Sequence, residues 1–240
     1  MHKRALNKKW LFLLALLALL TGCVPVDCLN PLYTDSNVIF DPALLGKWVG
    51  SEPDESLRLE RAENNAYQIV LTEKKESGTL QQTVYEAHLV NLGGEKYLDL
   101  VPKEFTGSSN EILFKMDSAK KGARFAPTLE KIAEGLYLEL AGPTPGKGTV
   151  QELQVKLRTV HWIFKVEMHE KSLSLYHLDH EWIQEAIKKG KIQAQYTKAR
   201  KEAGTTFVLT GSTADLQALV VHTVDDPGAF AEGMALQKVD

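Results

Sequence analysis

The chain has 240 residues, with 28 Lys and Arg against 31 Asp and Glu, and a net charge of −3 at pH 7. Its hydrophobic share of 44% is large enough to build a packed core, so the composition excludes a disordered chain. The negative charge argues against a nucleic-acid-binding protein. The two cysteines are too few for a disulfide framework.

A short apolar run, Leu11–Leu20, follows a basic N-terminus that contains no acidic residue. A helix rises about 1.5 Å per residue, so this run covers roughly half of a ~30 Å hydrocarbon core. It is too short to span a membrane, and its basic-then-apolar order is typical of a secretory signal peptide. The run ends in Leu-Thr-Gly-Cys at residues 20–23, which resembles the lipobox of bacterial lipoproteins.

The resemblance implies that residues 1–22 are a cleaved signal peptide and that Cys23 becomes the lipidated first residue. An ordinary signal peptide followed by a chance cysteine is the alternative. Two or three acyl chains attach a protein durably to a membrane. Val24 is not the Asp that retains many Gram-negative lipoproteins in the inner membrane, so it favours the outer membrane, with the domain facing the periplasm.

Cleavage would remove four of the 28 basic residues and leave 24 against 31 acidic residues, a net charge of about −7. Such a domain is not expected to be held electrostatically on anionic lipid. Residues 23–43 are expected to form a lipidated tether, because Pro25, Pro31 and Pro42 break regular structure. Apolar residues within the tether predict that part of it packs on the domain. Cys28 is interpreted as an unpaired thiol near this linker, with a reactive thiol or an intermolecular bridge as the alternative.

From residue 44 the hydrophobic pattern has a period of two, which predicts strands with one wet face. Together with the strand that starts at Gly46, the pattern predicts an antiparallel meander of about five strands. The other alternating stretches are Leu57–Leu59, Tyr67–Leu71, Tyr85–Leu89 and Tyr97–Leu100. Hairpin turns are expected between them, at Asn64-Asn65, Ser77-Gly78 and Gly93-Gly94.

Residues 102–149 lose this order and are interpreted as an irregular insertion with one strand at Leu136–Leu140. The Gly- and Pro-rich stretch at 142–148 is interpreted as a hairpin tip, with a linker as the alternative. Alternation resumes afterwards and predicts three further strands. Their expected ranges are 150–158, 162–168 and 172–178.

The C-terminal part is expected to contain two or three helices. Asp179 opens the first helix, which ends at Lys188-Lys189-Gly190. After a strand at Thr205–Leu209, Ser212 or Thr213 caps a second helix with Asp215 in its first turn. A short third helix is expected over Asp226–Phe230, and an edge strand over Met234–Val239.

The three residues Gly46-Lys47-Trp48 resemble the G-x-W motif that opens lipocalin and related calycin barrels. The resemblance implies that Gly46 and Trp48 plug the closed end of a barrel, under an Arg from late in the chain; Arg158 and Arg200 are the possibilities. The chain departs from the family in lacking a T-D-Y-type second motif and in being longer. The alternative is a buried tryptophan at a strand start in another β fold.

These elements together predict a mostly β (α+β) fold, either an antiparallel meander or a calycin-like barrel. We expect residues 44–240 to form a single globular domain. The wider pattern of N-P-L-Y, then L-x-G-x-W, then a late T-A-x-L-Q helix also resembles bacterial lipoproteins of unknown function.

The densest cluster of potential metal ligands is His177, Asp179 and His180, followed by Glu181. These residues are weak zinc candidates, because their spacing matches no H-E-x-x-H helix and Asp179 suits a helix cap. Ser118 and Lys121 spell S-x-x-K, but no S-D-N or K-T-G completes a penicillin-binding site. No G-x-S-x-G or phosphate-binding glycine loop occurs. We therefore expect no enzyme, no metal and no cofactor.

The sequence predicts a lipid-anchored envelope protein that is a non-catalytic binding module for a small apolar or amphiphilic ligand. The alternative is an envelope interaction or assembly lipoprotein with a filled core and a protein partner. An eight-stranded barrel can take either form, because its interior can be filled by side chains or hold one small ligand. The expected partners are the membrane, through lipid on Cys23, and either a small apolar ligand or an envelope protein. No nucleic-acid partner is expected.

Overall fold

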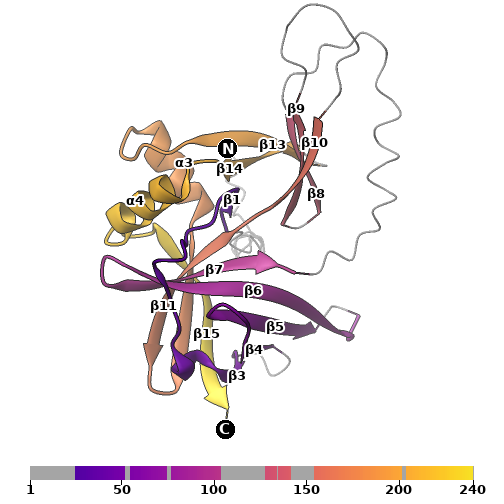
Figure 1. Ribbon diagram of the computed structural model, residues 1–240, viewed down its shortest axis with the longest axis vertical. Coiled ribbons are helices and arrows are strands. Elements are labelled where there is room, and N and C mark those ends of the chain that lie inside the picture. Colours follow the sequence, from indigo (N-terminus) through magenta and orange to yellow (C-terminus); the bar gives the residue numbers. More distant parts are fainter. Residues whose placement is uncertain are drawn as a thin grey trace, which may run out of the picture.

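Eight antiparallel strands close on themselves to form a barrel (Figure 1). The computed structural model describes residues 25–51, 55–74, 77–103, 128–133, 135–141, 154–201 and 204–239. Each barrel strand pairs with the barrel strand that follows it in the chain, and the last barrel strand pairs with the first. The expected mostly β barrel fold is therefore confirmed. The barrel strands are β3 (Gly46–Val49), β4 (Ser56–Arg61), β5 (Ala66–Lys74), β6 (Leu80–Leu92), β7 (Glu95–Pro102), β11 (Trp162–His169), β12 (Ser172–Leu178) and β15 (Phe230–Val239).

The first five barrel strands form the predicted meander, with turns at the predicted places. Asn64 and Asn65 have φ angles of 55° and 59°, the left-handed pair that a tight hairpin turn requires. Along β6, Tyr85, Ala87 and Leu89 belong to the core inside the barrel, whereas the residues between them face outward. The period of two in the sequence therefore reports which face of each strand is buried.

Two excursions from the barrel build a second, smaller sheet. The first supplies β8 (Thr128–Ala133), β9 (Leu136–Ala141) and β10 (Gln154–Thr159). The second supplies α3 (His180–Lys188), β13 (Tyr196–Lys201), β14 (Gly204–Leu209) and α4 (Thr213–Thr223). The strand order is β1-β14-β13-β8-β9-β10, where β1 is Asp27–Cys28. Two further short elements precede the barrel, namely β2 (Val38–Ile39), which pairs with β6, and the 3₁₀ helix η1 (Pro42–Leu44).

Several local expectations differ from the structure. The segment Asp226–Ala229 is a turn and not a third helix, because the Ala229 N–H bonds back to the Asp226 carbonyl and β15 begins at once. The expected strand over Met234–Val239 is present as part of β15, but it is not an edge strand, because β12 and β3 pair with it on both sides. Within the stretch 102–149, β8 forms a hairpin with the predicted strand at β9, while the tip at 142–148 and Ser118–Lys121 lie outside the described residues. The charged strand β13 carries no alternating signal and is missed.

Both predicted helix caps are present. The Asp179 side chain accepts a hydrogen bond from the Trp182 N–H at 2.6 Å, and α3 is followed by Gly190 at φ 68°. Ser212 and Asp215 form a reciprocal capping box at the start of α4. Among the described residues, neither helix has the length and apolar character that crossing a bilayer requires.

Two hydrophobic cores lie on the two sides of the barrel wall. The inner core contains Trp48, Tyr67 and Leu98. The outer core lies between the wall and the two helices, and it contains Tyr97 and Ile163 from the wall. The second sheet contributes to both cores, so the two excursions and the barrel share buried surface.

Two buried tyrosines give a matched test of this packing. Tyr67 Oη accepts from the Asp41 N–H at 2.7 Å, whereas Tyr97 Oη is buried without a partner among the described residues. Burial, with the nearby charges of Glu95 and Asp225, raises the pKa of Tyr97 to about 12. Removing an unsatisfied buried hydroxyl is close to neutral or stabilising, whereas removing a bonded one costs about 0.5–1.5 kcal/mol.

We expect Tyr97→Phe to leave the free energy of unfolding in urea unchanged or raised, and Tyr67→Phe to lower it by about 1 kcal/mol. Equal losses in the two variants would show that Tyr97 Oη has a hydrogen-bond partner in solution.

Candidate functional site

The chain segment that follows the expected lipid attachment site is built into the fold. Cys23 and residues 1–22 lie outside the described residues. Residues 25–33, here called the strap, cross from the barrel to the second sheet. Val26, Cys28 and Leu32 in the strap are at most 1% exposed. From residue 25 onward, the segment expected to be a tether is thus largely packed.

Backbone and side-chain hydrogen bonds fix the strap along its length. Cys28 exchanges two backbone hydrogen bonds with His161 before β11, at 3.1 and 2.8 Å. The Asn30 amide donates to the Gly211 carbonyl at 2.8 Å, and Gln217 of α4 donates to the Leu32 carbonyl at 2.8 Å. The strap therefore joins the barrel, the second sheet and α4.

Two buried carboxylates hold the strap from opposite ends. Asp27 is 3% exposed and accepts from Trp162 Nε1 at 2.7 Å, from the Tyr137 hydroxyl, and from Lys131 Nζ at 3.4 Å. Asp99 of β7 has no exposed surface. It accepts from the Leu32 N–H at 2.6 Å and from His161 Nδ1 at 2.7 Å. Buried carboxylates need such donors, since an unpaired buried charge is strongly destabilising.

Burial decides the chemistry of Cys28, and the two carboxylates add to its effect. The thiol is completely buried. Burial, with the charges of Asp99 and Asp27, raises the pKa of the Cys28 thiol well above its ordinary value. The thiolate is the reactive form, so this cysteine is an inert core residue and not a reactive or bridging one.

Trp48 lies at one end of the barrel, under a lysine from the last strand. Its Nε1 donates to the Leu44 carbonyl at 2.9 Å, and Lys238 Nζ lies 5.1 Å from the ring centroid. Gly46 has φ +124°, and a Cβ there would lie 3.2 Å from Lys238 Cε, so glycine gives this lysine its room. The late cation over Trp48 is therefore Lys238. Arg158 instead donates to the Leu29 carbonyl, and Arg200 lies on β13.

The inner core fills the barrel around Trp48. A void large enough for a ligand would leave accessible surface on the side chains that line it. Several inner side chains have none, namely Trp48, Tyr67, Ile69, Ala87, Leu89, Leu98 and Leu173. Leu129, Tyr137 and Val160, from the second sheet and the strand boundary before β11, pack in the same cluster. The barrel interior is therefore closely packed around these residues, whereas Leu71, Leu100, Leu129 and Trp162 of the same cluster keep 7–8% exposure.

The structure separates the candidate zinc ligands. His177 is buried, with no partner for Nε2 among the described residues. Asp179 caps α3, and the His180 ring packs edge-on against Phe207 with its centroid 5.9 Å away. Within the described ranges, no three His, Cys, Asp or Glu side chains are placed to hold a metal ion.

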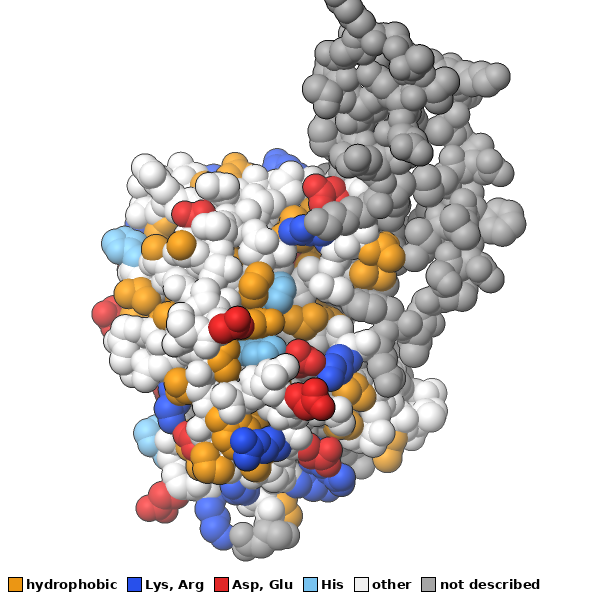
Figure 2. Space-filling view, viewed as in Figure 1, with side chains coloured by type: hydrophobic (Ala, Val, Ile, Leu, Met, Phe, Trp, Pro, Cys, Tyr) orange, Lys and Arg blue, Asp and Glu red, His pale blue; other side chains and the backbone are white. Residues whose placement is uncertain are grey.

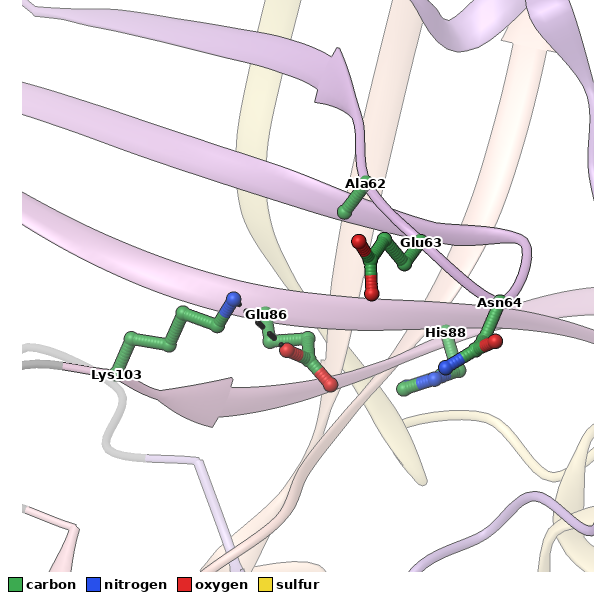
Figure 3. Close-up of a pocket in the computed structure, with 6 residues that line it drawn as sticks. All are labelled: Ala62, Glu63, Asn64, Glu86, His88 and Lys103. Atoms are coloured by element: carbon green, nitrogen blue, oxygen red, sulfur yellow. Dashed lines mark ion pairs between the residues drawn. The ribbon is translucent and has the colours of Figure 1, made fainter.

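A small polar pocket of about 310 Å³ lies on the outer wall of the barrel (Figure 3). Its lining residues are Ala62, Glu63, Asn64, Glu86, His88 and Lys103. Lys103 Nζ pairs with Glu86 at 2.9 Å, and the His88 ring stacks on Tyr33 of the strap with centroids 3.9 Å apart. Burial lowers the pKa of His88, which favours the neutral imidazole. Two carboxylates against one ammonium suit a small polar molecule with a positive charge.

Sequence reasoning missed Asp27, Asp99, Lys238 and Tyr33. One signal was present for Asp99, an acid inside the apolar stretch Tyr97–Val101. Period-two alternation assigns this position to the wet face, and only the tertiary structure shows that the strap covers it.

Trp48→Ala should destabilise the protein by roughly 3–5 kcal/mol, because it removes a large, fully buried ring. We expect a large fall in the unfolding midpoint and loss of the blue-shifted, quencher-protected part of the fluorescence. Lys238→Met keeps the aliphatic stem and serves as the control, with a cost of about 1 kcal/mol. Melting of Trp48→Ala within about a degree or two of the parent would rule out a plug role.

The free energy of unfolding should decrease as the pH drops below about 6.5, and protonation of His88 should account for part of the decrease. Burial lowers the pKa of both His88 and His180 below their ordinary value of 6.5. Between the folded and unfolded pKa values of these histidines, the unfolded chain binds more protons than the folded chain does. Lowering the pH through this range therefore favours unfolding. We expect His88→Gln to flatten the plot of unfolding free energy against pH. An unchanged slope would show that folded His88 protonates as readily as the unfolded residue.

Comparisons with models of known protein families, with curated proteins and with solved structures found no match. The roles assigned to the strap, to Trp48 and to the outer pocket therefore depend on their geometry alone.

Proposed function

We propose that this protein is a lipid-anchored component of a bacterial cell envelope that works as a non-catalytic interaction module for a protein partner. The anchor is lipid on Cys23, and Val24 favours the outer membrane with the domain on its periplasmic side. The observation that carries the proposal is the solid inner core around Trp48.

The close packing around Trp48 supports a protein partner over a small apolar ligand at this end of the barrel. A lipocalin-like binding site needs a cavity, and the side chains around Trp48 leave no accessible surface for one. The domain then acts through its outside. Exposed apolar side chains are available there, including Leu80 at 59% and Val239 at 44% exposure.

The roles of the buried acidic groups support a non-catalytic module. Asp27 accepts from three donors and Asp99 from two, and these contacts fix the strap. A general acid or base must reach a substrate proton, and these carboxylates are at most 3% exposed.

Native mass spectrometry of the mature protein, extracted in detergent from its own host, tests the proposal in one measurement. We expect a covalent mass increase of two or three acyl chains on Cys23, a bound protein in defined stoichiometry, and no retained small molecule. Cys23→Ser should lose the acyl mass and remain unprocessed at this site.

A stoichiometric apolar molecule released only on unfolding would favour the ligand-binding alternative and overturn the filled-core function. A Cys23→Ser protein that matures and fractionates like the parent would overturn the anchor.

A further inference from the structure

The strap leaves almost no spacer between Cys23 and the folded domain. Pro25 already forms a β-bridge with Asp179, and Val26 is 1% exposed. An extended chain spans at most about 3.3–3.6 Å per residue, so two residues reach roughly 7 Å. A lipid on Cys23 would therefore place the surface around Pro25 at the membrane.

A series of contacts leads from Pro25 to the outer residues of β13. Asp179, the bridge partner of Pro25, is followed by His180, whose ring packs on Phe207 of β14. Tyr196 of β13 packs on the same phenylalanine, with its ring centroid 4.6 Å from that of Phe207. In Figure 1, β1, β13, β14 and α3 lie at the same end of the molecule, opposite the C-terminus.

Tyr196, Lys198 and Arg200 share one face of β13, because side chains alternate along a strand. Tyr196 is 46% exposed, and both cations are exposed. Neither Lys198 nor Arg200 has an ion-pair partner among the described residues. Figure 2 shows Lys and Arg side chains at the upper edge of the molecule, along which β13 and β14 run in Figure 1.

The chemistry of this face matches the interfacial region of a bilayer. Tyrosine prefers the headgroup level, where its ring is partly buried and its hydroxyl stays wet. Lys and Arg near an anionic leaflet each gain attraction from it. The net charge of about −7 argues against an electrostatic hold on the domain as a whole, but Lys198 and Arg200, which have no ion-pair partner within the described residues, can attract anionic headgroups locally.

We infer that the face formed by Tyr196, Lys198 and Arg200, here called the basic face, lies against the lipid headgroups of the membrane that holds Cys23. This inference rests on the proposed lipidation of Cys23. The strap fixes the orientation, and the basic face stabilises it, so that the Trp48 end of the barrel points away from the bilayer.

Depth-dependent quenching on the lipidated protein tests the inference. The protein is reconstituted into vesicles of phosphatidylethanolamine and phosphatidylglycerol, some with brominated acyl chains. A fluorophore is attached in separate variants to Tyr196→Cys and Val239→Cys, which start from similar exposures of 46% and 44%. Cys28 is completely buried and should not react in the folded protein.

We expect severalfold stronger quenching at position 196 than at position 239. Adding Lys198→Glu and Arg200→Glu should weaken contact at 196 by about fivefold per cation. Lys47→Glu with Arg58→Glu is the matched control, because these exposed cations face each other on β3 and β4 and should not affect quenching at 196.

Each failure has its own signature. If the wild-type protein carries no acyl mass, the proposed anchor is wrong, and so is the orientation that depends on it. With the acyl chains in place, equal quenching at 196 and 239 would overturn the orientation alone. Quenching at 196 that survives both charge reversals would show that the two cations do not hold the face to the lipid.

Discussion

The buried carboxylate of Asp27 is the interaction on which the arrangement of the whole molecule depends. A charge without solvent must be surrounded by donors, and here the donors come from separate parts of the chain. Trp162 belongs to the barrel, while Lys131 and Tyr137 belong to the second sheet. Asp27 itself belongs to the strap. The requirement of one carboxylate therefore brings the barrel, the second sheet and the N-terminal segment to one point.

The topology explains why such a joint is needed. The second sheet combines strands from two excursions that are separated by β11 and β12 in the chain. The two excursions meet where β13 pairs in parallel with β8, and Arg200 and Glu130 are the paired residues. The strap adds β1 beside β14 and reaches the barrel through Asp99. A misplaced strap would leave a buried carboxylate without its donors. The hydrogen-bonded carboxylates therefore allow fewer arrangements of the strap than apolar contact alone would.

How far the sequence predicts the structure depends on whether the cause is local. The meander, its turns and both helix caps follow from neighbouring residues, such as Asn64 with Asn65 and Ser212 with Asp215, and these predictions are confirmed. The strap depends on partners far along the chain: Leu32 is paired with an acid 67 positions later. The prolines of the strap correctly indicate an irregular backbone. They do not show whether that backbone is exposed as a tether or buried in the fold.

The candidate sites show the same limit. Trp48 could be singled out from a short motif, because a glycine before a tryptophan at a strand start is a local pattern. Its cation could not, since nothing near Lys238 in sequence marks it as a partner of the ring. The zinc candidates fail for the opposite reason: His177 and His180 are close in sequence, but a strand end and a helix start turn them to different surroundings.

Closure of the barrel by its last strand has a consequence for the order of folding. Lys238 donates to the Ala43 carbonyl across 195 positions of sequence, and the pairs between β15 and β3, from Gln237 with Val49 to Val239 with Lys47, are 188 to 192 positions apart. The first barrel strand therefore has only one of its two neighbours until about 190 further residues have been synthesised. Contacts this distant close slowly, because a long loop must be ordered before they form. For a chain that we propose to be exported, this delay helps to keep it unfolded until it has crossed the inner membrane.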